Sequence, residues 1–286
     1  MILVTGATGH LGSATIAHLL KNTTADKIAA LARDEIKARD LNEKVVEVRI
    51  GTYDDIASLD RAFQGVGKVL LISGTDPNRL QQHKNVVDAA KKAGVKHIVY
   101  TGFSLKDIHT SALTGLLEAN FQTEDYIKAS GLRYTFLRNT LYTDGIPMFA
   151  GEKVFETGIA LPAGNGKVPY ALRREMGEAA ANVLLQTGHD NNTYEITGNE
   201  LYSYADVAKT LSGLSGKDIA YNDVDAETFP DQLKQAGIPE FVSYLITGYA
   251  TDTKNNQFEA VSKDLERLLG RKPATLKEGL KEVYKF

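Results

Sequence analysis

Three glycines near the start of the chain have the spacing of a phosphate-binding turn. The sequence begins MILVTGATGHLG, in which Gly6, Gly9 and Gly12 form the pattern G-x-x-G-x-x-G. Residues 2–5 favour a buried strand and residues 13–20 carry apolar side chains at helical spacing, so the glycines lie in a strand-to-helix turn. Such a turn allows backbone N–H groups and the positive end of a helix to approach a pyrophosphate. The pattern predicts dinucleotide binding, and an ordinary tight turn is the alternative.

Basic side chains follow at the position where a dinucleotide-binding unit contacts the adenosine ribose. An acidic residue about 20 positions after the glycines selects NAD, whereas an arginine there accommodates the 2′-phosphate of NADP. Arg33 occupies this position, and Lys37 and Arg39 follow it closely, so several cations can converge on a dianionic phosphate. We therefore predict a preference for NADPH. Asp34 would favour NADH if the register moved by one residue, and solvent-facing charges at a helix start are the alternative interpretation of the cations.

The elements that position these residues alternate between strands and helices. Strand-like runs recur at residues 27–32, 45–50, 68–73, 96–101 and 133–138. Helical patterns such as NVVDAAKKAG and NFQTEDYIKASG lie between them, and Gly94 and Gly131 stand where helices should end. This alternation predicts an α/β fold, a Rossmann-type doubly wound parallel sheet with helices on both faces.

The rhythm changes after about Tyr142, where a looser, glycine-bearing stretch runs through PAGNGKVPY. Further helices are predicted at residues 174–186, 203–215 and 264–269, and TYEIT at 193–197 is expected to return to the sheet as a strand. We therefore expect an NAD(P)-binding Rossmann core at residues 1–142 and a smaller, interwoven substrate lobe at residues 143–286.

Composition restricts the chemistry that the chain can perform. Its 286 residues are 43% hydrophobic and 24% charged, which is typical of a globular protein, and the net charge of −3 gives no reason to expect nucleic acid. The absence of cysteine excludes disulfides, thiolate metal sites and cysteine nucleophiles. The histidines lack metal-ligand spacing, and no Gly-x-Ser-x-Gly motif is present. No apolar stretch reaches about 18 residues, so we expect no membrane span and a cytoplasmic location.

The chain resembles the NmrA-like, atypical branch of the short-chain dehydrogenase/reductase superfamily and, within it, the bacterial NAD(P)H:quinone oxidoreductases of type 2. The resemblance rests on VTGATGHLG, ARDEIK, QQHKNVVDAAKKAGVKHIVYTG, KASGLRYTFLRNTLY, GNGK and LLGRKPATLKEGL. It implies that the phosphate loop is formed by Gly6, Thr8, Gly9, His10, Leu11 and Gly12. It also implies that Arg33 meets the 2′-phosphate, that Ser73 and Gly74 line the adenine-ribose side, and that Thr101, Gly102, Phe103 and Asn139 approach the nicotinamide. A homodimer is plausible from this analogy alone.

The chain departs from the superfamily at the catalytic positions. Most active members carry Tyr-x-x-x-Lys on the helix after the fifth strand, where the tyrosine donates a proton and the lysine lowers its pKa. The corresponding residues here are Leu116 and Asn120. Asn120 also replaces the lysine or histidine that is usual in the NmrA-like branch, whereas Glu124 is kept. An acid often found after the third strand is replaced by Thr52, although Asp55 remains. We assign no catalytic acid.

Loss of this dyad should impair the reduction of a quinone less than the reduction of a ketone. A ketone yields a strongly basic alkoxide that needs a proton donor, whereas a quinone yields a delocalised anion that water can protonate. Positioning of the acceptor against the nicotinamide then supplies most of the catalysis. We predict an NADPH:quinone reductase, with NADH as a possible second donor. The predicted substrate residues are Phe103, Asn120 and Tyr142.

Each predicted substrate contact has a structural alternative. Phe103, Tyr142 and Phe149 can stack on a flat ring or simply pack in the core. Asn120 can hydrogen-bond a quinone oxygen or point to solvent, and His109 in its loop is more typical of a solvated surface group. The alternative function is a non-catalytic NADP(H)-binding sensor that controls a partner, and a sugar-nucleotide epimerase or reductase ranks last because it needs the absent dyad.

Overall fold

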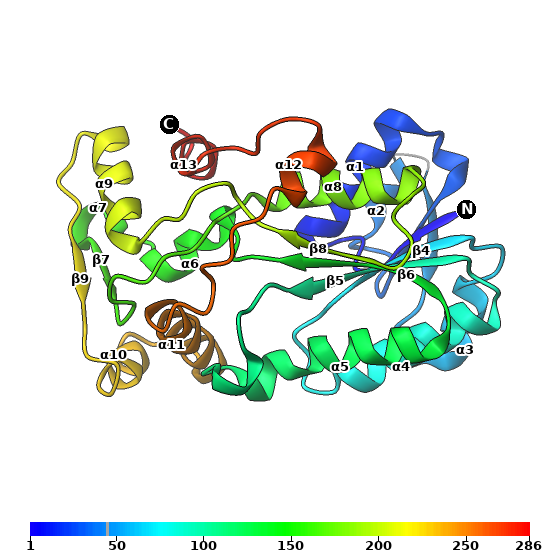
Figure 1. Ribbon diagram of the computed structural model, residues 1–286, viewed down its shortest axis with the longest axis horizontal. Coiled ribbons are helices and arrows are strands. Elements are labelled where there is room, and N and C mark those ends of the chain that lie inside the picture. Colours follow the sequence, from blue (N-terminus) through cyan, green and yellow to red (C-terminus); the bar gives the residue numbers. More distant parts are fainter. Residues whose placement is uncertain (44–45) are drawn as a thin grey trace.

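The computed structural model describes residues 1–43 and 46–286 and contains a seven-stranded parallel sheet (Figure 1). The strands lie in the order β3-β2-β1-β4-β5-β6-β8. Their bounds are β1 (Ile2–Val4), β2 (Ile28–Ala32), β3 (Glu47–Ile50), β4 (Lys68–Ile72), β5 (His97–Phe103), β6 (Arg133–Asn139) and β8 (Asn192–Ile196). The strand order reverses between β1 and β4, and ligands of such sheets bind beyond the carboxyl ends of the strands at this point. The predicted α/β Rossmann-type fold is confirmed.

Helices cover both faces of the sheet (Figure 1). One face carries α1 (His10–Asn22), α2 (Arg39–Glu43), α8 (Arg173–Leu185) and α12 (Asp264–Leu269). The other carries α3 (Ile56–Ala62), α4 (Arg79–Lys92) and α5 (Thr114–Ser130). Short 3-10 turns lie at Ala25–Lys27, Ile108–Thr110 and Thr143–Gly145. Each face has its own buried apolar cluster, as a doubly wound sheet requires.

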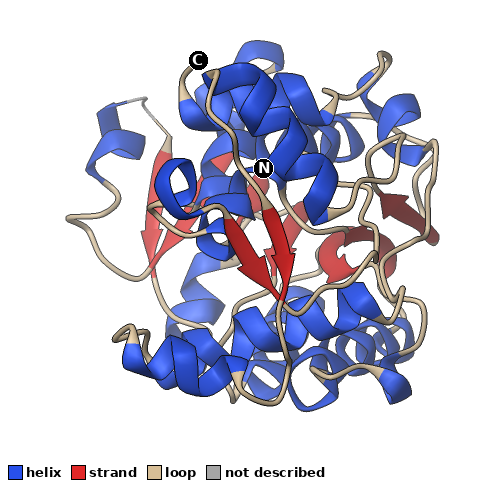
Figure 2. Cartoon of the chain, turned by 90° about the vertical axis from the view of Figure 1, so that its left-hand side faces the viewer, coloured by secondary structure: helices blue, strands red, loops and turns tan. Residues whose placement is uncertain are grey.

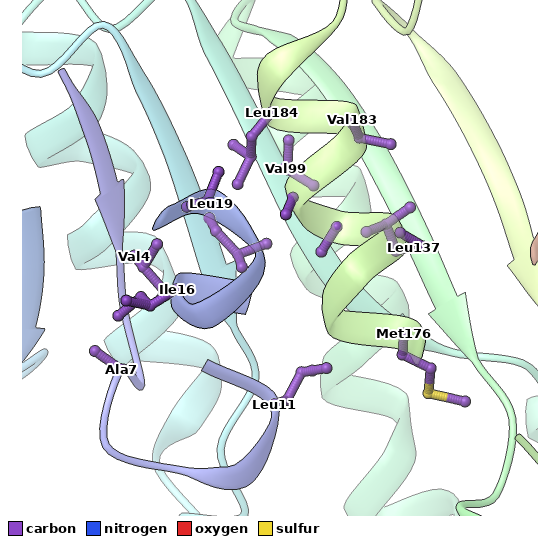
Figure 3. Close-up of a cluster of buried hydrophobic side chains, with 14 of the residues drawn as sticks. Val4, Ala7, Leu11, Ile16, Leu19, Val99, Leu137, Met176, Val183 and Leu184 are labelled. Carbon is purple, nitrogen blue, oxygen red and sulfur yellow. The ribbon is translucent and has the colours of Figure 1, made fainter. Parts of the chain in front are cut away.

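The contact between α1 and α8 is unusually close because small residues lie in it. A Cβ atom added at Gly177 of α8 would stand 2.9 Å from the backbone nitrogen of Thr15 in α1, a distance that real Cβ atoms do not tolerate. Around this contact, Leu19 of α1 lies toward Leu184 of α8, whereas Ile16 lies on the other side of α1, beside Val4 of β1 (Figure 3). The helix that begins at the glycine turn is therefore held in place by a helix from the second half of the chain.

A second, smaller body lies beyond the carboxyl ends of the strands, and the strands point toward it (Figure 1). We call this body the lobe. It contains α6 (Ile146–Ala150), α7 (Val154–Thr157), β7 (Ile159–Leu161), α9 (Tyr204–Ser215), β9 (Tyr221–Asp223), α10 (Phe229–Gln235), α11 (Glu240–Lys254) and α13 (Leu276–Tyr284). β7 and β9 form a separate parallel pair. Seen from the lobe end, helices lie above and below the strands (Figure 2).

The predicted elements overlap those of the structure, with shifted ends. The predicted strand at residues 27–32 corresponds to β2, and that at 45–50 corresponds to β3, although Val45 lies outside the described residues. The helix predicted from residue 203 begins at Tyr204, because Ser203 caps it in a reciprocal pair of hydrogen bonds with Asp206. Residues 193–197 overlap β8, which pairs in parallel with β6. β8, α8 and α12 all pack with the Rossmann sheet although they follow residue 142 in the chain.

Candidate functional site

A cleft with a volume of about 930 Å³ opens at the carboxyl ends of β1, β2, β3 and β4. This volume lies within the range of about 300–1,000 Å³ that is usual for ligand sites. Seven of the predicted cofactor residues line the cleft, namely Gly6, Thr8, Gly9, Arg33, Lys37, Ser73 and Gly74. Its other lining residues are Leu31, Ala32, Asp34, Gly51, Thr52, Tyr53, Asp54, Ile72, Thr75, Asp76 and Gln82. The cleft therefore brings the glycine turn and the predicted phosphate-binding cations together.

The glycine turn needs its glycines for two different reasons. Gly6 has a φ of +58°, in the left-handed region that favours glycine. A Cβ atom at Gly12 would lie 2.3 Å from the carbonyl oxygen of Gly6, so only glycine lets the helix start this close to the turn. Gly9 is the N-cap of α1 and offers no side-chain cap to the first N–H groups of that helix. These backbone groups and the helix dipole are free to bind a phosphate.

The other predicted members of the phosphate loop stand behind the turn. His10, Leu11 and Gly12 form the first residues of α1 and do not line the cleft. The side chain of Leu11 is buried in the core against α8 (Figure 3). Their backbone forms the N-terminus of the helix, and of their side chains only that of Leu11 packs the helix against the core, since His10 is exposed.

At the ribose end of the cleft, two cations are exposed and the carboxylates have local partners. Arg33 and Lys37 are exposed on the cleft wall. Asp34 Oδ1 accepts a hydrogen bond from the backbone N–H of Ile36 at 2.7 Å, which fixes that carboxylate in the turn. Asp76 Oδ1 accepts from the N–H of Asn78 at 2.8 Å. Arg39 lies in α2 and does not line the cleft. This arrangement favours a phosphate beside Arg33 over a ribose hydroxyl beside Asp34.

Tyr53 lies in the wall of the cleft and was not among the predicted site residues. Its hydroxyl donates to Thr5 Oγ1 and also contacts the carbonyl oxygen of Ile72 at 3.2 Å. Burial raises the pKa of Tyr53, so the hydroxyl stays protonated. Tyr53 follows shortly after β3, at the ligand edge of the sheet, so its place near the site could have been predicted from the sequence. Asp55 is not free for adenine, because it caps α3 by accepting from the N–H groups of Ala57 and Ser58.

A chain of hydrogen-bonded polar side chains continues from Ser73, half-buried in the cleft wall, toward β5 and α5. The N–H of Ser73 donates to Thr101 Oγ1 at 3.1 Å. Asn120 Oδ1 accepts from Ser73 Oγ at 3.0 Å and from the hydroxyl of Tyr100 at 3.1 Å. Asn120 is only 5% exposed, so the alternative that it points to solvent is wrong. Because Oδ1 takes both bonds, the Nδ2 amide group of Asn120 is the donor left for a ligand.

The same edge of α5 is anchored by a buried ion pair. Glu124, which is 2% exposed, accepts two hydrogen bonds from Arg138 of β6, at 2.9 and 2.7 Å. Arg138 also reaches Glu195 of β8 at 3.3 Å. The forked geometry fixes α5 against the sheet, one turn after Asn120. Glu124 therefore positions Asn120 and does not itself face the cleft.

The remaining predicted residues lie along the boundary between the sheet and the lobe. Asn139 and Thr101 are buried and do not line the cleft. Phe103 packs in an aromatic cluster, which we define as Phe103, Phe149, Tyr249 and Phe258, with ring centroids 5.9–6.3 Å apart along its contacts.

Tyr142 and His109 have other surroundings. The ring of Tyr142 lies 5.1 Å from the guanidinium of Arg173, which pairs with Asp144. Burial raises the pKa of Tyr142. His109 is exposed. Neither residue lines the cleft, and neither is placed as a proton donor to it.

A second hollow of about 860 Å³ lies between α8 and α13. It is lined by acids and arginines that pair with one another, as Arg271 does with Glu175 at 2.6 Å. Within residues 1–43 and 46–286, no group of three potential metal ligands occurs. In the same part of the chain, no helix is long and apolar enough to cross a membrane. The first cleft is therefore the candidate site.

Comparison with known proteins agrees with this geometry. The model of the NmrA-like family matches residues 1–286. Quinone oxidoreductase 2 of Escherichia coli (strain K12) is 36% identical over 286 residues, which cover 99% of each chain. The Citrobacter sp. triphenylmethane reductase complexed with NADP(H) superimposes with a TM-score of 0.93 at 39% identity, over 99% of this chain and 100% of that one. The NADPH complex of an Escherichia coli NADPH-dependent quinone oxidoreductase gives a TM-score of 0.93 at 35% identity, with the same coverage.

Proposed function

The chain belongs to the NmrA-like family, and from this membership and its site we propose that it is an NADPH-dependent quinone reductase. The observation that carries the proposal is the position of Arg33 and Lys37, exposed on the wall of a cleft that the glycine turn also lines. The similar proteins include a quinone oxidoreductase and structures complexed with NADPH or NADP(H). The cofactor supplies the hydride when it is bound, and a quinone is the acceptor.

The residues of the cleft fit this cofactor. The backbone of Gly6, Thr8 and Gly9 and the N-terminus of α1 would bind the pyrophosphate, and Gly12 allows α1 to start close enough to the turn for this. Arg33 and Lys37 bind the 2′-phosphate, which carries more charge than the ribose hydroxyl of NADH. Ser73 and Gly74 line the continuation toward β5.

At the nicotinamide end, the side chains orient an acceptor and do not donate a proton. Asn120 stands where the superfamily has its lysine, and its Nδ2 group offers a hydrogen bond. The aromatic cluster at the lobe boundary provides flat apolar surfaces for a planar ring. Because reduction of a quinone produces a delocalised anion, its final proton can come from water.

The proposal is tested by NADPH oxidation at 340 nm with and without soluble quinones. We expect saturable quinone-dependent turnover. In Arg33→Ala, kcat/KM for NADPH should fall about 10–100-fold while that for NADH changes little, because only NADPH loses a charge-assisted contact. Arg133→Ala is the matched control. Arg133 is exposed and pairs with Asp190 at the N-terminal end of β6, whereas the cleft opens at the carboxyl ends of the strands. Equal losses for both cofactors would contradict the role of Arg33.

Tight NADP(H) binding without turnover on any quinone would instead support the sensor, and the search would turn to its protein partner. We also propose, from the family resemblance, that the protein is a homodimer and, from the lack of a long apolar stretch in the sequence, that it is cytoplasmic. Light scattering of the purified protein tests the first statement, and fractionation of the host cell tests the second.

A further inference from the structure

Arg79 is a buried cation that forms no ion pair with any residue that the structure describes. It is the first residue of α4 and is 3% exposed. Its Nε and Nη2 atoms are enclosed and have no hydrogen-bond partner among residues 1–43 and 46–286. A guanidinium remains charged at physiological pH, and burial of an unpaired charge destabilises the fold. Such a group suggests a site prepared for an anion.

Aromatic side chains lie near Arg79. The phenols of Tyr100 of β5 and Tyr249 of α11 are close enough that their ionised forms would raise the pKa of Arg79. Burial raises the pKa of both phenols, so neither supplies a negative charge. His83, one turn further along α4, packs 5.6 Å from the ring of Tyr100, and burial, assisted by the charge of Arg79, lowers the pKa of His83 to about 3. These groups leave the positive charge uncompensated.

The N-terminus of α4 adds to the same field. Asn78, the N-cap, makes no side-chain hydrogen bond to the helix, so the first N–H groups of α4 lack a side-chain cap. The positive end of the helix dipole lies beside the guanidinium, and the carboxylate at this helix start, that of Asp76, accepts from the N–H of Asn78 and does not bond to Nε or Nη2 of Arg79. Both features favour an anion at the same place. Since only Nε and Nη2 are enclosed, Nη1 is the nitrogen through which Arg79 can meet a ligand.

Arg79 lies between the two parts of the site already described. On one side, the hydroxyl of Tyr100 leads through Asn120 to Ser73, which lines the cofactor cleft. On the other side, Tyr249 belongs to the aromatic cluster. The adenosine end is marked by Arg33 beyond β2, so the β4–β5 side of the cleft is the nicotinamide side. Arg79 begins the helix that follows β4, and it does not itself line the cleft.

We propose that Arg79 is the anion-binding group of the acceptor site and holds the oxygen of the acceptor that becomes negative on reduction. The proposal rests on the quinone reductase function. In that reaction the C4–H bond of the reduced nicotinamide breaks, and the hydrogen and its electron pair form a new bond to the quinone. An electron pair of the quinone then resides on its other oxygen, and water later supplies the proton that completes the quinol. A fixed guanidinium stabilises this developing charge without reorganisation.

The proposal also defines a ligand class. A planar aromatic molecule that carries an oxyanion and cannot be reduced should bind at the same place as the product anion. We choose 2-naphthoate as the probe and 2-naphthamide as its neutral counterpart of similar shape. The wild-type protein saturated with NADP+ should bind 2-naphthoate about tenfold or more tightly than 2-naphthamide, because only the carboxylate makes a charge-assisted contact.

Isothermal titration calorimetry of both probes tests the role of Arg79. Arg79→Met should weaken 2-naphthoate about tenfold or more and leave the affinities for 2-naphthamide and NADP+ unchanged. Arg79→Lys, which retains the charge, should recover part of the loss. Arg133→Met, at an exposed arginine, should match the wild type. Equal binding of the two probes by the wild type, or equal loss of both in Arg79→Met, would overturn the proposal.

Thermal unfolding separates this role from a structural one. Because the native state buries the charge without a partner, Arg79→Met should melt at the wild-type temperature or above it. A lower melting temperature would mean that the guanidinium stabilises the fold, which contradicts the proposal. The probes bind at equilibrium without turnover, so a failure of the quinone reaction and a failure of the anion site would be seen independently.

Discussion

The adenosine end and the acceptor end of the site are built in different ways. At the adenosine end, a backbone turn and exposed cations, all within the first 37 residues, face the ligand directly. At the acceptor end, Ser73, Tyr100 and Asn120 form a buried hydrogen-bonded chain, and the lobe adds Tyr249 from far along the sequence. In the proposed function the first end recognises a constant group, the phosphates, whereas the second depends on long-range packing that can change with the acceptor. The two ends should therefore fail separately when each is perturbed.

The largest effect should come from closing the glycine turn. In Gly12→Val the new side chain begins 2.3 Å from the Gly6 carbonyl oxygen, so α1 must move away from the turn. We expect a loss of about 3 kcal/mol in the free energy of unfolding and no measurable NADPH binding. Urea unfolding and calorimetry measure the two quantities.

The control for this prediction is Gly213→Ala in α9. That position has no neighbouring atom within 4 Å and lies in a helix, so alanine should be neutral or stabilise by up to about 1 kcal/mol. If Gly12→Val retained NADPH affinity, the turn would not be the pyrophosphate site.

A change at the buried ion pair should damage the acceptor end and spare the adenosine end. Arg138→Met leaves Glu124 buried without its partner, and we expect the free energy of unfolding to fall by about 3 kcal/mol. Because Glu124 fixes the α5 segment that carries Asn120, the KM for quinone should rise, whereas the affinity for NADP+ should change little.

Glu195→Gln provides the matched comparison, since it removes only the longer and more exposed contact of Arg138. Glu195→Gln should lower the free energy of unfolding by less than about 1 kcal/mol. If the NADP+ affinity of Arg138→Met fell by as large a factor as its KM for quinone rose, the two ends of the site could not be perturbed separately.

The smallest effect should be a pH dependence of the free energy of unfolding that arises from one carboxylate of the lobe. Asp252 of α11 accepts hydrogen bonds from Ser111 Oγ at 2.6 Å and from the N–H of Ala112 at 2.7 Å, just before α5. Burial raises the pKa of Asp252, so the native state holds its proton more tightly than the unfolded chain does. Its stabilising contribution is therefore complete below its ordinary pKa of 3.8 and is lost as the pH rises through the raised native value.

Asp252→Asn should remove this dependence. The difference in the free energy of unfolding between wild type and variant should decline by about 1 kcal/mol as the pH rises from about 4 to about 7. Melting temperatures measured across this range provide the test. Parallel curves for the two proteins would mean that the pKa of Asp252 is the same in the native state and in the unfolded chain, which would contradict the raised native value.

The same contrast explains what could be predicted from the sequence. The sheet and the candidate residues Gly6 and Arg33 follow from local patterns of apolar residues, glycine and charge. Arg79 and Tyr249 could not be identified, because their importance depends on which elements meet in space. β7 and β9 are three residues each, too short to show a period. Tyr53 could be predicted in part, since the sequence shows its place after β3 but not the hydrogen bonds that its hydroxyl makes.

The close contact between α1 and α8 has a consequence for synthesis of the chain. Gly177 of α8 approaches the backbone of α1 at Thr15, so the helix that presents its N-terminus to the phosphates is seated only after most of the polypeptide has been translated. A nascent chain that ends before α8 leaves one face of its first helices uncovered. Such contacts between distant segments slow folding and expose apolar surface meanwhile. The nucleotide-binding half is thus not an excisable module, and a gene fragment that encodes residues 1–142 should yield an aggregating product.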